Sequence, residues 1–305
     1  MSKRVLIIGS GPAGLTSAIY SVRGGLEPVV ISGSLPGGQL MLTSEVENYP
    51  GFAEPIMGPQ LMDEMRKQAE RLGTKFVDTD ATSVDFSSKT FKVVAGEETY
   101  EGDAVIIATG ASAMWLGLDS EQRLRGRGVS ACATCDGFFF KDKEVVVVGG
   151  GDTAMEEALF LTKFATKVTV IHRRDELRAS KILQARAFEN PKINFMWNTM
   201  VEDVVGSNQV EGVRVKNLVT GETSKIVCQG VFIAIGHKPN TEIFRGHVEV
   251  DEKGYAVRKN ETRSSTDGVF VAGDVYDYVY RQAVTAAASG CKAALDAIKY
   301  LESSR

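Results

Sequence analysis

The sequence predicts an α/β protein built from two similar units, the second of which is inserted into the first. Apolar runs at 5–8 and, within the expected strand 143–148, at 145–148 are each followed by a glycine-rich turn and a helical pattern. Continuous apolar runs of this length are typical of strands in a parallel sheet that is covered on both faces. A further apolar run at 268–275 follows the closing strand of the second unit, so we expect it to complete the first.

Length and composition fit a globular protein of two domains. The 305 residues exceed one typical domain, and the chain is 43% hydrophobic and 24% charged, with 31 glycines. A formal charge of -4 gives no reason to expect nucleic acid or a membrane surface as the main partner. No apolar run is long enough to span a bilayer, and the N-terminal apolar run ends in a glycine-rich turn, unlike a signal peptide. We therefore expect a cytoplasmic protein.

The first glycine-rich turn fits a dinucleotide-binding loop. The strand at 5–8 leads into Gly-x-Gly-x-x-Gly, and residues 15–22 continue as a helix, which is the context that this motif requires. Its first glycine permits a tight turn, its second lets the backbone approach a pyrophosphate, and its third allows close helix packing. The candidate residues are Gly9, Ser10, Gly11, Pro12, Ala13 and Gly14. A plain turn without a ligand is the alternative, and the second strand, 28–32, ends without the acid that usually binds a ribose.

Further candidate ligand-binding residues follow in a loop-rich segment and at the end of a later strand. Amide side chains in the segment 33–58 could hydrogen-bond the edge of a heterocycle, although ordinary turn chemistry explains the segment equally well. A helix is expected at 60–72. The strand at 103–111 ends in a glycine that either lies beneath a ligand or simply ends the strand. The candidates are Gly38, Gln39, Leu40, Asn48, Thr109 and Gly110.

A Cys-x-x-Cys pair followed by an acid lies between the two glycine-rich turns. Cys132 and Cys135 could close a disulfide and open to a dithiol, and Asp136 could exchange a proton with them. The same spacing builds half of many zinc sites, but Cys228 and Cys291 stand alone and no histidine has a suitable spacing. Redox chemistry is therefore the favoured interpretation, and no metal is expected.

The second glycine-rich turn repeats the motif as Gly-x-Gly-x-x-Ala, between the strand at 143–148 and a helix. Two such motifs in the right context are far more specific than one and indicate an internal duplication. After the next strand, 167–171, arginines stand where an NAD site would have an acid, and guanidinium groups suit a 2′-phosphate. NADPH is implied, and a solvated basic helix start is the alternative. The candidate residues are Gly149, Gly150, Gly151, Asp152, Thr153, His172, Arg173, Arg174 and Arg178.

The C-terminal segment is expected to belong to the first unit. A strand at 229–236 closes the second unit, and the later strand ends in Gly273-Asp274, where a carboxylate could accept hydrogen bonds from a sugar alcohol such as ribitol. The helix that follows is opened by Arg281, Gln282 and Ala283, and its N-terminus would face the same ligand. The sequence thus predicts two Rossmann-like dinucleotide-binding domains, a discontinuous one at 1–114 and 245–305 and an inserted one at 115–244.

Together these motifs resemble the low-molecular-weight thioredoxin reductases, which are NADPH-dependent flavoproteins of bacteria, archaea and plants. The likeness covers nearly the whole chain in the family's order, from Gly9–Gly14 through Cys132–Asp136 to Gly273–Ala283. It implies FAD in the discontinuous domain, NADPH in the inserted domain, oxidised thioredoxin as the protein substrate, and a homodimer. The missing acid after the second strand is in keeping with this family.

The resemblance also implies roles for individual residues. Cys135 would face the flavin, Cys132 would attack the disulfide of the partner, and Asp136 would donate and accept the proton. The flavin site would include Gln39, Asn48, Asp274 and Gln282, and the 2′-phosphate site would include Arg173, Arg174 and Arg178. Members of the family rotate one domain against the other, so that nicotinamide and the cysteine pair reach the flavin alternately.

Two other functions remain open at this point. A related disulfide reductase could take electrons from ferredoxin or a reduced flavin, although the intact second glycine loop and its arginines argue against it. A non-catalytic redox sensor that binds a nucleotide would not need the acid beside the cysteines.

Overall fold

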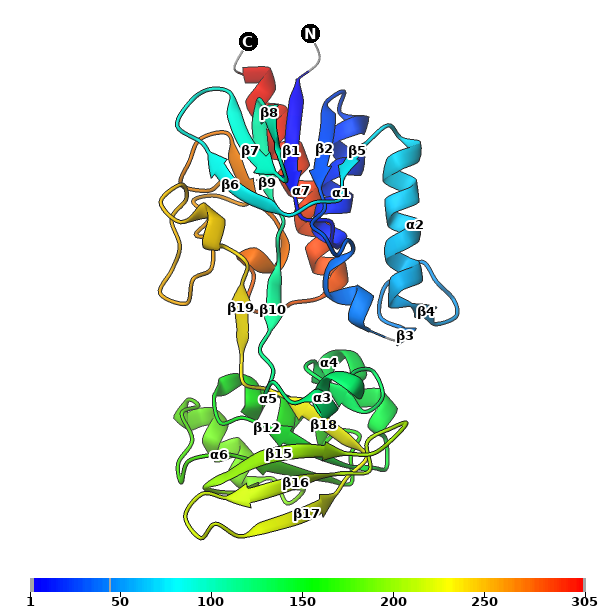
Figure 1. The fold of residues 1–305 in the computed structure, drawn as a ribbon, viewed down its shortest axis with the longest axis vertical. Helices are drawn as coiled ribbons and strands as arrows, with labels where there is room; N and C mark the ends of the chain where they lie inside the picture. The colour runs from blue at the N-terminus through cyan, green and yellow to red at the C-terminus, as the bar shows by residue number, and fades with distance from the viewer. Residues whose placement is uncertain (1–2, 44, 304–305) are drawn as a thin grey trace. The chain divides into compact units, whose positions relative to one another are not determined.

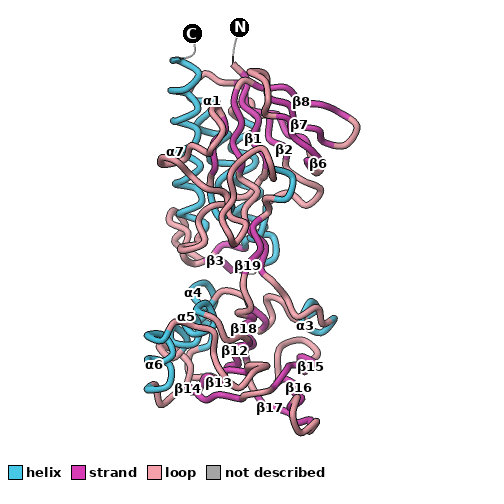
Figure 2. Tube along the Cα trace, turned by 90° about the vertical axis from the view of Figure 1, so that its left-hand side faces the viewer, coloured by secondary structure: helices cyan, strands magenta, loops and turns pink. Residues whose placement is uncertain are grey.

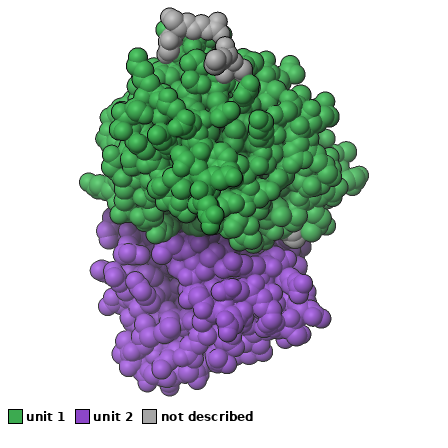
Figure 3. Space-filling model, turned by 45° about the horizontal axis from the view of Figure 1, so that its top comes forward, with its two compact units in different colours: residues 1–112, 238–305 green, residues 113–237 purple. Residues whose placement is uncertain are grey.

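The computed structural model describes residues 3–43 and 45–303 and divides into two compact units (Figure 3). Unit 1 comprises residues 1–112 and 238–305, and unit 2 comprises residues 113–237. The chain passes from unit 1 to unit 2 between residues 112 and 113 and returns between residues 237 and 238. The sequence predicts these two boundaries at 114/115 and 244/245. The second crossing comes earlier because Asn240 is already tied to unit 1, where its backbone N–H donates to the Gly110 carbonyl over 3.0 Å.

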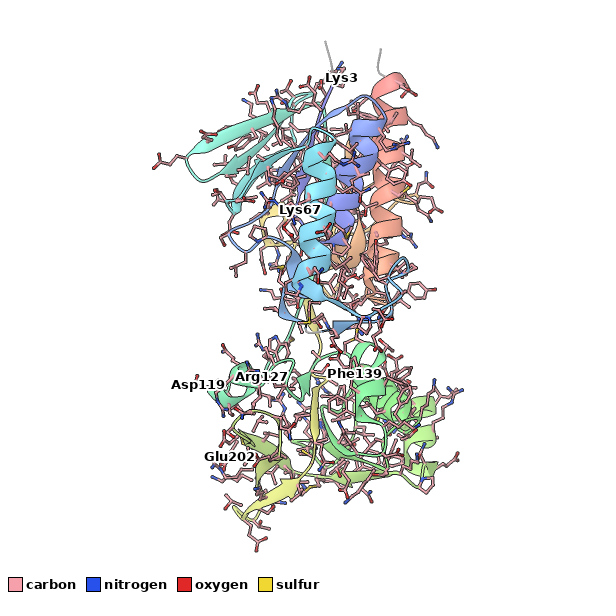
Figure 4. All side chains as sticks on the ribbon, turned by 90° about the vertical axis from the view of Figure 1, so that its right-hand side faces the viewer. Lys3, Lys67, Asp119, Arg127, Phe139 and Glu202 are labelled. Atoms are coloured by element: carbon pink, nitrogen blue, oxygen red, sulfur yellow. A yellow bond between two sulfur atoms is a disulfide. The ribbon has the colours of Figure 1, made fainter. Side chains whose placement is uncertain are left out.

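Unit 1 is built on a five-stranded parallel sheet in the order β20-β9-β1-β2-β5 (Figure 1). These strands are β1 (Arg4–Ile8), β2 (Glu27–Ile31), β5 (Lys75–Val77), β9 (Ala104–Ile107) and β20 (Val269–Val271). β20 pairs with β9, with Phe270 opposite Ile106, so the C-terminal segment completes the first sheet as the sequence predicts. Lys3 joins the starts of β1 and β9 through an ion pair with Asp103 (2.9 Å; Figure 4).

Helices pack on one face of this sheet and a small antiparallel sheet packs on the other (Figures 1 and 2). α1 (Pro12–Arg23) and α7 (Ala283–Ser303) bury Ile7 and Ile106, while the second sheet buries Leu6 and Ile107. Because alternate strand residues face opposite layers, both sets must be apolar. The remaining elements are α2 (Gly58–Arg71), β3 (Glu45–Val46), β4 (Ile56–Met57), β6 (Ala81–Asp85), β7 (Phe91–Ala95) and β8 (Glu98–Gly102).

Unit 2 repeats this architecture. Its parallel sheet has the order β11-β18-β12-β13-β14, with helices burying Val145 and Val147 on one face and an antiparallel sheet burying Val146 and Val148 on the other. The parallel strands are β11 (Val129–Ser130), β12 (Glu144–Val148), β13 (Lys167–Ile171), β14 (Ile193–Met196) and β18 (Gly230–Ile233). The other elements are α3 (Asp119–Arg123), α4 (Ala133–Asp136), α5 (Asp152–Leu161), α6 (Lys181–Glu189), β15 (Thr199–Val205), β16 (Gly212–Asn217) and β17 (Thr223–Val227). The duplication predicted from the two glycine motifs is confirmed.

The connections between the units are two short strands. β10 (Ala111–Ala113) and β19 (His237–Pro239) form a two-stranded sheet of their own. No helix within residues 3–43 and 45–303 is long and apolar enough to cross a membrane.

Replacing Phe232 by alanine should lower the free energy of unfolding of unit 2 by about 3–5 kcal/mol, the usual cost of removing a fully buried ring. Phe232 is 0% exposed in β18, an interior strand of the sheet, and meets the Phe140 ring edge-on, with centroids 5.1 Å apart. Both tryptophans, Trp115 and Trp197, lie in unit 2, so urea unfolding followed by tryptophan fluorescence reports on this unit. The exposed Val219→Ala is the control and should change the free energy by less than about 0.5 kcal/mol. Equal effects of the two substitutions would contradict this account of the core.

Candidate functional site

The two sulfurs of the Cys-x-x-Cys segment are joined in the structure. Cys132 and Cys135 form a disulfide with an S–S distance of 2.06 Å, at the start of the short helix α4. The Cys135 N–H donates to Sγ of Cys132 (3.2 Å), and the Cys132 N–H donates to the Ser130 hydroxyl oxygen (3.0 Å). Once the disulfide opens, the first of these hydrogen bonds favours a thiolate at Cys132, because an N–H donor stabilises negative charge on sulfur.

Asp136, the acid after the cysteine pair, lies in an environment that favours its protonated form. Burial raises the pKa of the Asp136 carboxyl, and a hydrogen bond with the Ser130 hydroxyl opposes that shift. A carboxyl whose pKa is raised can exchange protons with a thiol more readily than an exposed aspartate can. Ser130 therefore touches both the backbone of Cys132 and the side chain of Asp136, a role that the sequence did not reveal.

The other cysteines do not join this site. Cys228 is 1% exposed, and burial raises the pKa of its thiol to about 12, which makes it unreactive. Cys291 is partly buried on α7. Among the residues that the structure describes, no group of three or more His, Cys, Asp or Glu side chains is arranged to hold a metal ion.

Three phenylalanines follow the redox pair. Phe140 lies in the core of unit 2, Phe139 is partly buried against that core (Figure 4), and Phe138 is 60% exposed. Core packing therefore explains Phe139 and Phe140, whereas the ring of Phe138 is accessible at the surface of unit 2.

The first glycine loop has the backbone that its motif requires. Gly9 has a φ of +111°, and a side chain there would overlap the Ala108 carbonyl at the end of β9. A side chain at Gly14 would overlap the Gly9 carbonyl, whereas no atom lies within 4 Å of the Cβ position of Gly11. The outer glycines thus serve packing, and the middle one leaves space beside the N-terminus of α1.

The loop that follows β2 is fastened to the first glycine loop. The Ser10 hydroxyl donates to the Ser32 carbonyl (2.9 Å) and accepts from the Gly37 N–H (3.0 Å). This brings Gly38 against Gly11, since the Cβ position of Gly38 lies 3.4 Å from Cα of Gly11. Gln39 and Leu40 continue from Gly38 in a 3-10 turn over Gly38–Leu42.

Candidate residues from distant parts of the sequence also contact one another in unit 1. The Cβ position of Gly273 lies 2.9 Å from Cβ of Ala13, and the Gly273 N–H donates to the hydroxyl of Ser289 on α7 (2.6 Å). The Asn48 side-chain amide donates to the Gln282 side-chain oxygen (3.3 Å). Candidates that are far apart in the sequence are therefore neighbours, and buried Ser289 is a supporting residue that sequence reasoning missed.

Asp274 is a partly buried acid at this edge of the sheet. Burial, together with the nearby Asp277, raises the pKa of its carboxyl to about 7, and Arg281 opposes the shift. Arg281 has a φ of +49°, which is rare for a residue with a side chain and marks a strained point just before α7. α7 begins at Ala283, two residues after the position where the sequence suggested that the helix opens.

Thr109 and Gly110 are held by Asn240, a residue that the sequence patterns do not single out. The Thr109 hydroxyl donates to the Asn240 carbonyl (2.7 Å), and the Asn240 side-chain amide donates to the Thr109 carbonyl (2.9 Å). Gly110 has a φ of +66° and open space at its Cβ position. The Thr109 side chain thus has a structural partner, while Gly110 leaves room at the end of β9.

The second glycine loop repeats the backbone of the first. Gly149 has a φ of +152° and would overlap the Ala234 carbonyl if it carried a side chain, and no atom lies within 4 Å of the Cβ position of Gly151. Asp152 and Thr153 then start helix α5. The space beside Gly151 matches the space beside Gly11 in unit 1.

The segment with the arginines lies on the second glycine loop. The Arg178 N–H donates to the Gly150 carbonyl (2.7 Å), and the Ser180 N–H donates to the Asp152 carboxylate (2.6 Å). The side chains of Arg173, Arg174 and Arg178 are exposed, and His172 is 5% exposed. Helix α6 begins only at Lys181, so the arginines occupy a turn and not a helix start.

Comparison with known proteins agrees with this arrangement. Residues 3–290 match the model of the family described as pyridine nucleotide-disulphide oxidoreductase. The thioredoxin reductase of Rickettsia prowazekii (strain Madrid E) is 55% identical over 306 residues, covering 99% of both chains. The thioredoxin reductase of Mycolicibacterium smegmatis is 56% identical over 300 residues, covering 97% of this chain and 96% of the relative.

The chain belongs to the pyridine nucleotide-disulphide oxidoreductases, and within them to the thioredoxin reductases. Solved structures of this family have the same fold. The thioredoxin reductase from Giardia duodenalis superposes with a TM-score of 0.94 at 44% identity, covering 99% of both chains. That of Streptococcus pyogenes MGAS5005 gives 0.94 at 41% identity, covering 99% of this chain and 100% of the other.

Proposed function

We propose that the protein is an NADPH-dependent thioredoxin-disulfide reductase that uses FAD and the Cys132–Cys135 disulfide. The observation that carries the proposal is the disulfide itself, which is followed by an acid with a raised pKa and lies in a chain with two glycine loops. The intact second loop and its three exposed arginines favour a nicotinamide donor over ferredoxin. The acid favours catalysis over a sensor that only binds a nucleotide.

The residues of unit 1 fit FAD. The open backbone at Gly11, next to the N-terminus of α1, suits a pyrophosphate, and the partly buried carboxyl of Asp274 suits hydroxyl groups that donate hydrogen bonds to its oxygens. Asn48 and Gln282 would present amides to the isoalloxazine edge. The proposed site comprises Gly9, Ser10, Gly11, Pro12, Ala13, Gly14, Gly38, Gln39, Leu40, Asn48, Thr109, Gly110, Gly273, Asp274, Arg281, Gln282 and Ala283.

The residues of unit 2 fit NADPH. The space beside Gly151, next to the N-terminus of α5, suits the pyrophosphate, and the guanidinium groups of Arg173, Arg174 and Arg178 suit the 2′-phosphate. Gly149, Gly150, Asp152, Thr153 and His172 complete the proposed site.

The chain's own groups perform the thiol chemistry. Bound FAD supplies the conversion of a hydride from NADPH into an electron pair for the disulfide. The Cys132 thiolate then attacks the disulfide of thioredoxin to form a mixed disulfide, and the thiolate of Cys135 displaces the reduced partner and closes the Cys132–Cys135 bond again. Asp136 supplies the proton that the departing thiolate of the partner takes up.

Thioredoxin is the proposed protein substrate because relatives that are 55% and 56% identical carry the name thioredoxin reductase. A homodimer and a cytoplasmic location are proposed from the same likeness. The family expectation that one domain rotates against the other is retained as part of the proposal.

The test of this function is the oxidation of NADPH by the yellow, flavin-loaded protein. Oxidation should depend on added oxidised thioredoxin and should be slow with glutathione disulfide or with no disulfide. A colourless folded protein, or equal rates with and without thioredoxin, would sink the proposal.

Asp274→Asn should stabilise the flavin-free protein by about 2 kcal/mol at pH 8 and by much less at pH 4. A carboxyl whose pKa is raised on folding disfavours the folded state once it ionises. The stability that the protonated Asp274 carboxyl contributes is therefore fully present below its ordinary pKa of 3.8. This stability is lost as the pH rises to its folded-state pKa of about 7. Urea unfolding of both proteins at the two pH values measures the difference. The same difference at pH 4 and pH 8 would contradict the assigned cause, and the variant should also hold FAD more weakly.

A further inference from the structure

Two equivalent positions of the repeated units are filled by different residues. The middle position of Gly-x-Gly is Ser10 in unit 1 and Gly150 in unit 2, and the first residue after the second strand is Ser32 or His172. In both units the loop after that strand must be held close to the glycine loop. The two units hold this loop by different contacts.

In unit 1 the side chain of the middle residue makes the connection, because the Ser10 hydroxyl holds both the Ser32 carbonyl and the Gly37 N–H. In unit 2 the backbone of the middle residue makes it. The Gly150 carbonyl accepts from the N–H groups of Arg178 (2.7 Å) and Ala179 (3.2 Å).

The space that a side chain at Gly150 would need is taken by histidine. Its Cβ position overlaps the imidazole ring of His172, which is also met edge-on by the Trp197 ring with centroids 6.3 Å apart. His172 Nε2 lies 3.0 Å from the Glu176 carbonyl oxygen, inside the segment with the arginines. Burial lowers the pKa of His172, and the charges of Arg178, Arg174 and Arg173 lower it further, so the neutral ring donates this hydrogen bond.

The ring thus fills the gap between the glycine loop and the turn that carries the three arginines. We propose that His172 is a positioning residue that sets the arginine turn at 173–178 on the second glycine loop, and that position 150 is glycine in order to receive its ring. This inference rests on the proposed function, because it assigns those arginines to a 2′-phosphate.

The consequence is specific to the phosphate. A pyrophosphate would approach the backbone beside Gly151, where the Cβ position has open space and no arginine side chain is needed. A 2′-phosphate needs guanidinium groups at a set distance and angle, so a shift of the turn weakens that contact selectively. His172 then governs the choice between the two nucleotides through the position of the arginine turn.

The test is calorimetric binding of 2′,5′-ADP and of ADP to the oxidised, flavin-loaded protein, which involves no turnover. The wild type should prefer 2′,5′-ADP. His172→Ala should weaken the binding of 2′,5′-ADP by about tenfold and that of ADP by less than about threefold. A tenfold change lies within the range of interaction energies that neighbouring residues in contact usually show. His172→Gln keeps a donor near the position of Nε2 and should recover most of the affinity.

A double-mutant cycle tests the match between the two residues. Gly150→Ala should weaken 2′,5′-ADP by about tenfold in the wild type but by less than about twofold beside His172→Ala, where the ring is gone. Retention of flavin, and urea unfolding followed by tryptophan fluorescence, check that each variant is folded. If His172→Ala does not fold, His172→Asn, whose side chain is smaller than the imidazole ring, takes its place in both tests with the same expected results.

Equal weakening of both nucleotides by His172→Ala, or an equal cost of Gly150→Ala in both backgrounds, would overturn the inference. A wild type that does not prefer 2′,5′-ADP would instead overturn the assignment of NADPH. The two failures are therefore distinguishable.

Discussion

Cys135→Ser is expected to abolish NADPH-driven reduction of thioredoxin, with a loss of at least about a thousandfold. The relay needs two sulfurs, because Cys132 alone can form a mixed disulfide but has no neighbour to resolve it. Reduction of the flavin by NADPH should continue, because unit 2's nucleotide residues and unit 1's flavin residues are untouched. Stopped-flow absorbance of the flavin and a thioredoxin-dependent turnover assay measure the two steps separately.

The control is Cys291→Ser, which removes a thiol on α7 of unit 1 and should leave both steps unchanged. Turnover that survives in Cys135→Ser would contradict the relay. Loss of flavin reduction in the same variant would contradict the separation of the two steps.

Arg173→Ala combined with Arg174→Ala is expected to raise the KM for NADPH by about a hundredfold, as hydrogen bonds to a charged group contribute about 1.5–3 kcal/mol each. The KM for NADH should change by less than about threefold, because NADH has no 2′-phosphate to lose. Steady-state kinetics with each nucleotide at saturating thioredoxin give the two values.

Arg186→Ala is the matched control, since it removes another exposed arginine of unit 2, on helix α6. It should leave both KM values unchanged. An equal rise for NADPH and NADH in the double variant would mean that these arginines bind something other than the 2′-phosphate.

The fold was predictable because its determinants are local. Each parallel strand is a continuous apolar run, and each glycine loop follows its strand directly, so the spacing of Gly9, Gly11 and Gly14 already implies a turn, a helix start and a close packing contact. The redox pair was equally visible, because only two residues lie between the two cysteines, which can close a disulfide ring without help from the rest of the chain.

Residues that act across long separations were not predictable. Asn240 holds Thr109 and Ser289 holds Gly273 through hydrogen bonds that only the completed fold creates. Ser10 and Gly150, which lie between the first two glycines of their motifs, are another case. Their partners lie after the next strand, so the sequence alone could not distinguish a ligand contact by Ser10 from its bond to the Ser32 carbonyl.

The central claim is that electrons from NADPH open the Cys132–Cys135 disulfide. Anaerobic incubation of the flavin-loaded protein with NADPH, followed by alkylation and mass spectrometry of the peptide with both cysteines, tests it directly. The account predicts that both cysteines are alkylated with NADPH and that neither is alkylated without it. A disulfide that stays closed while NADPH reduces the flavin would contradict the account.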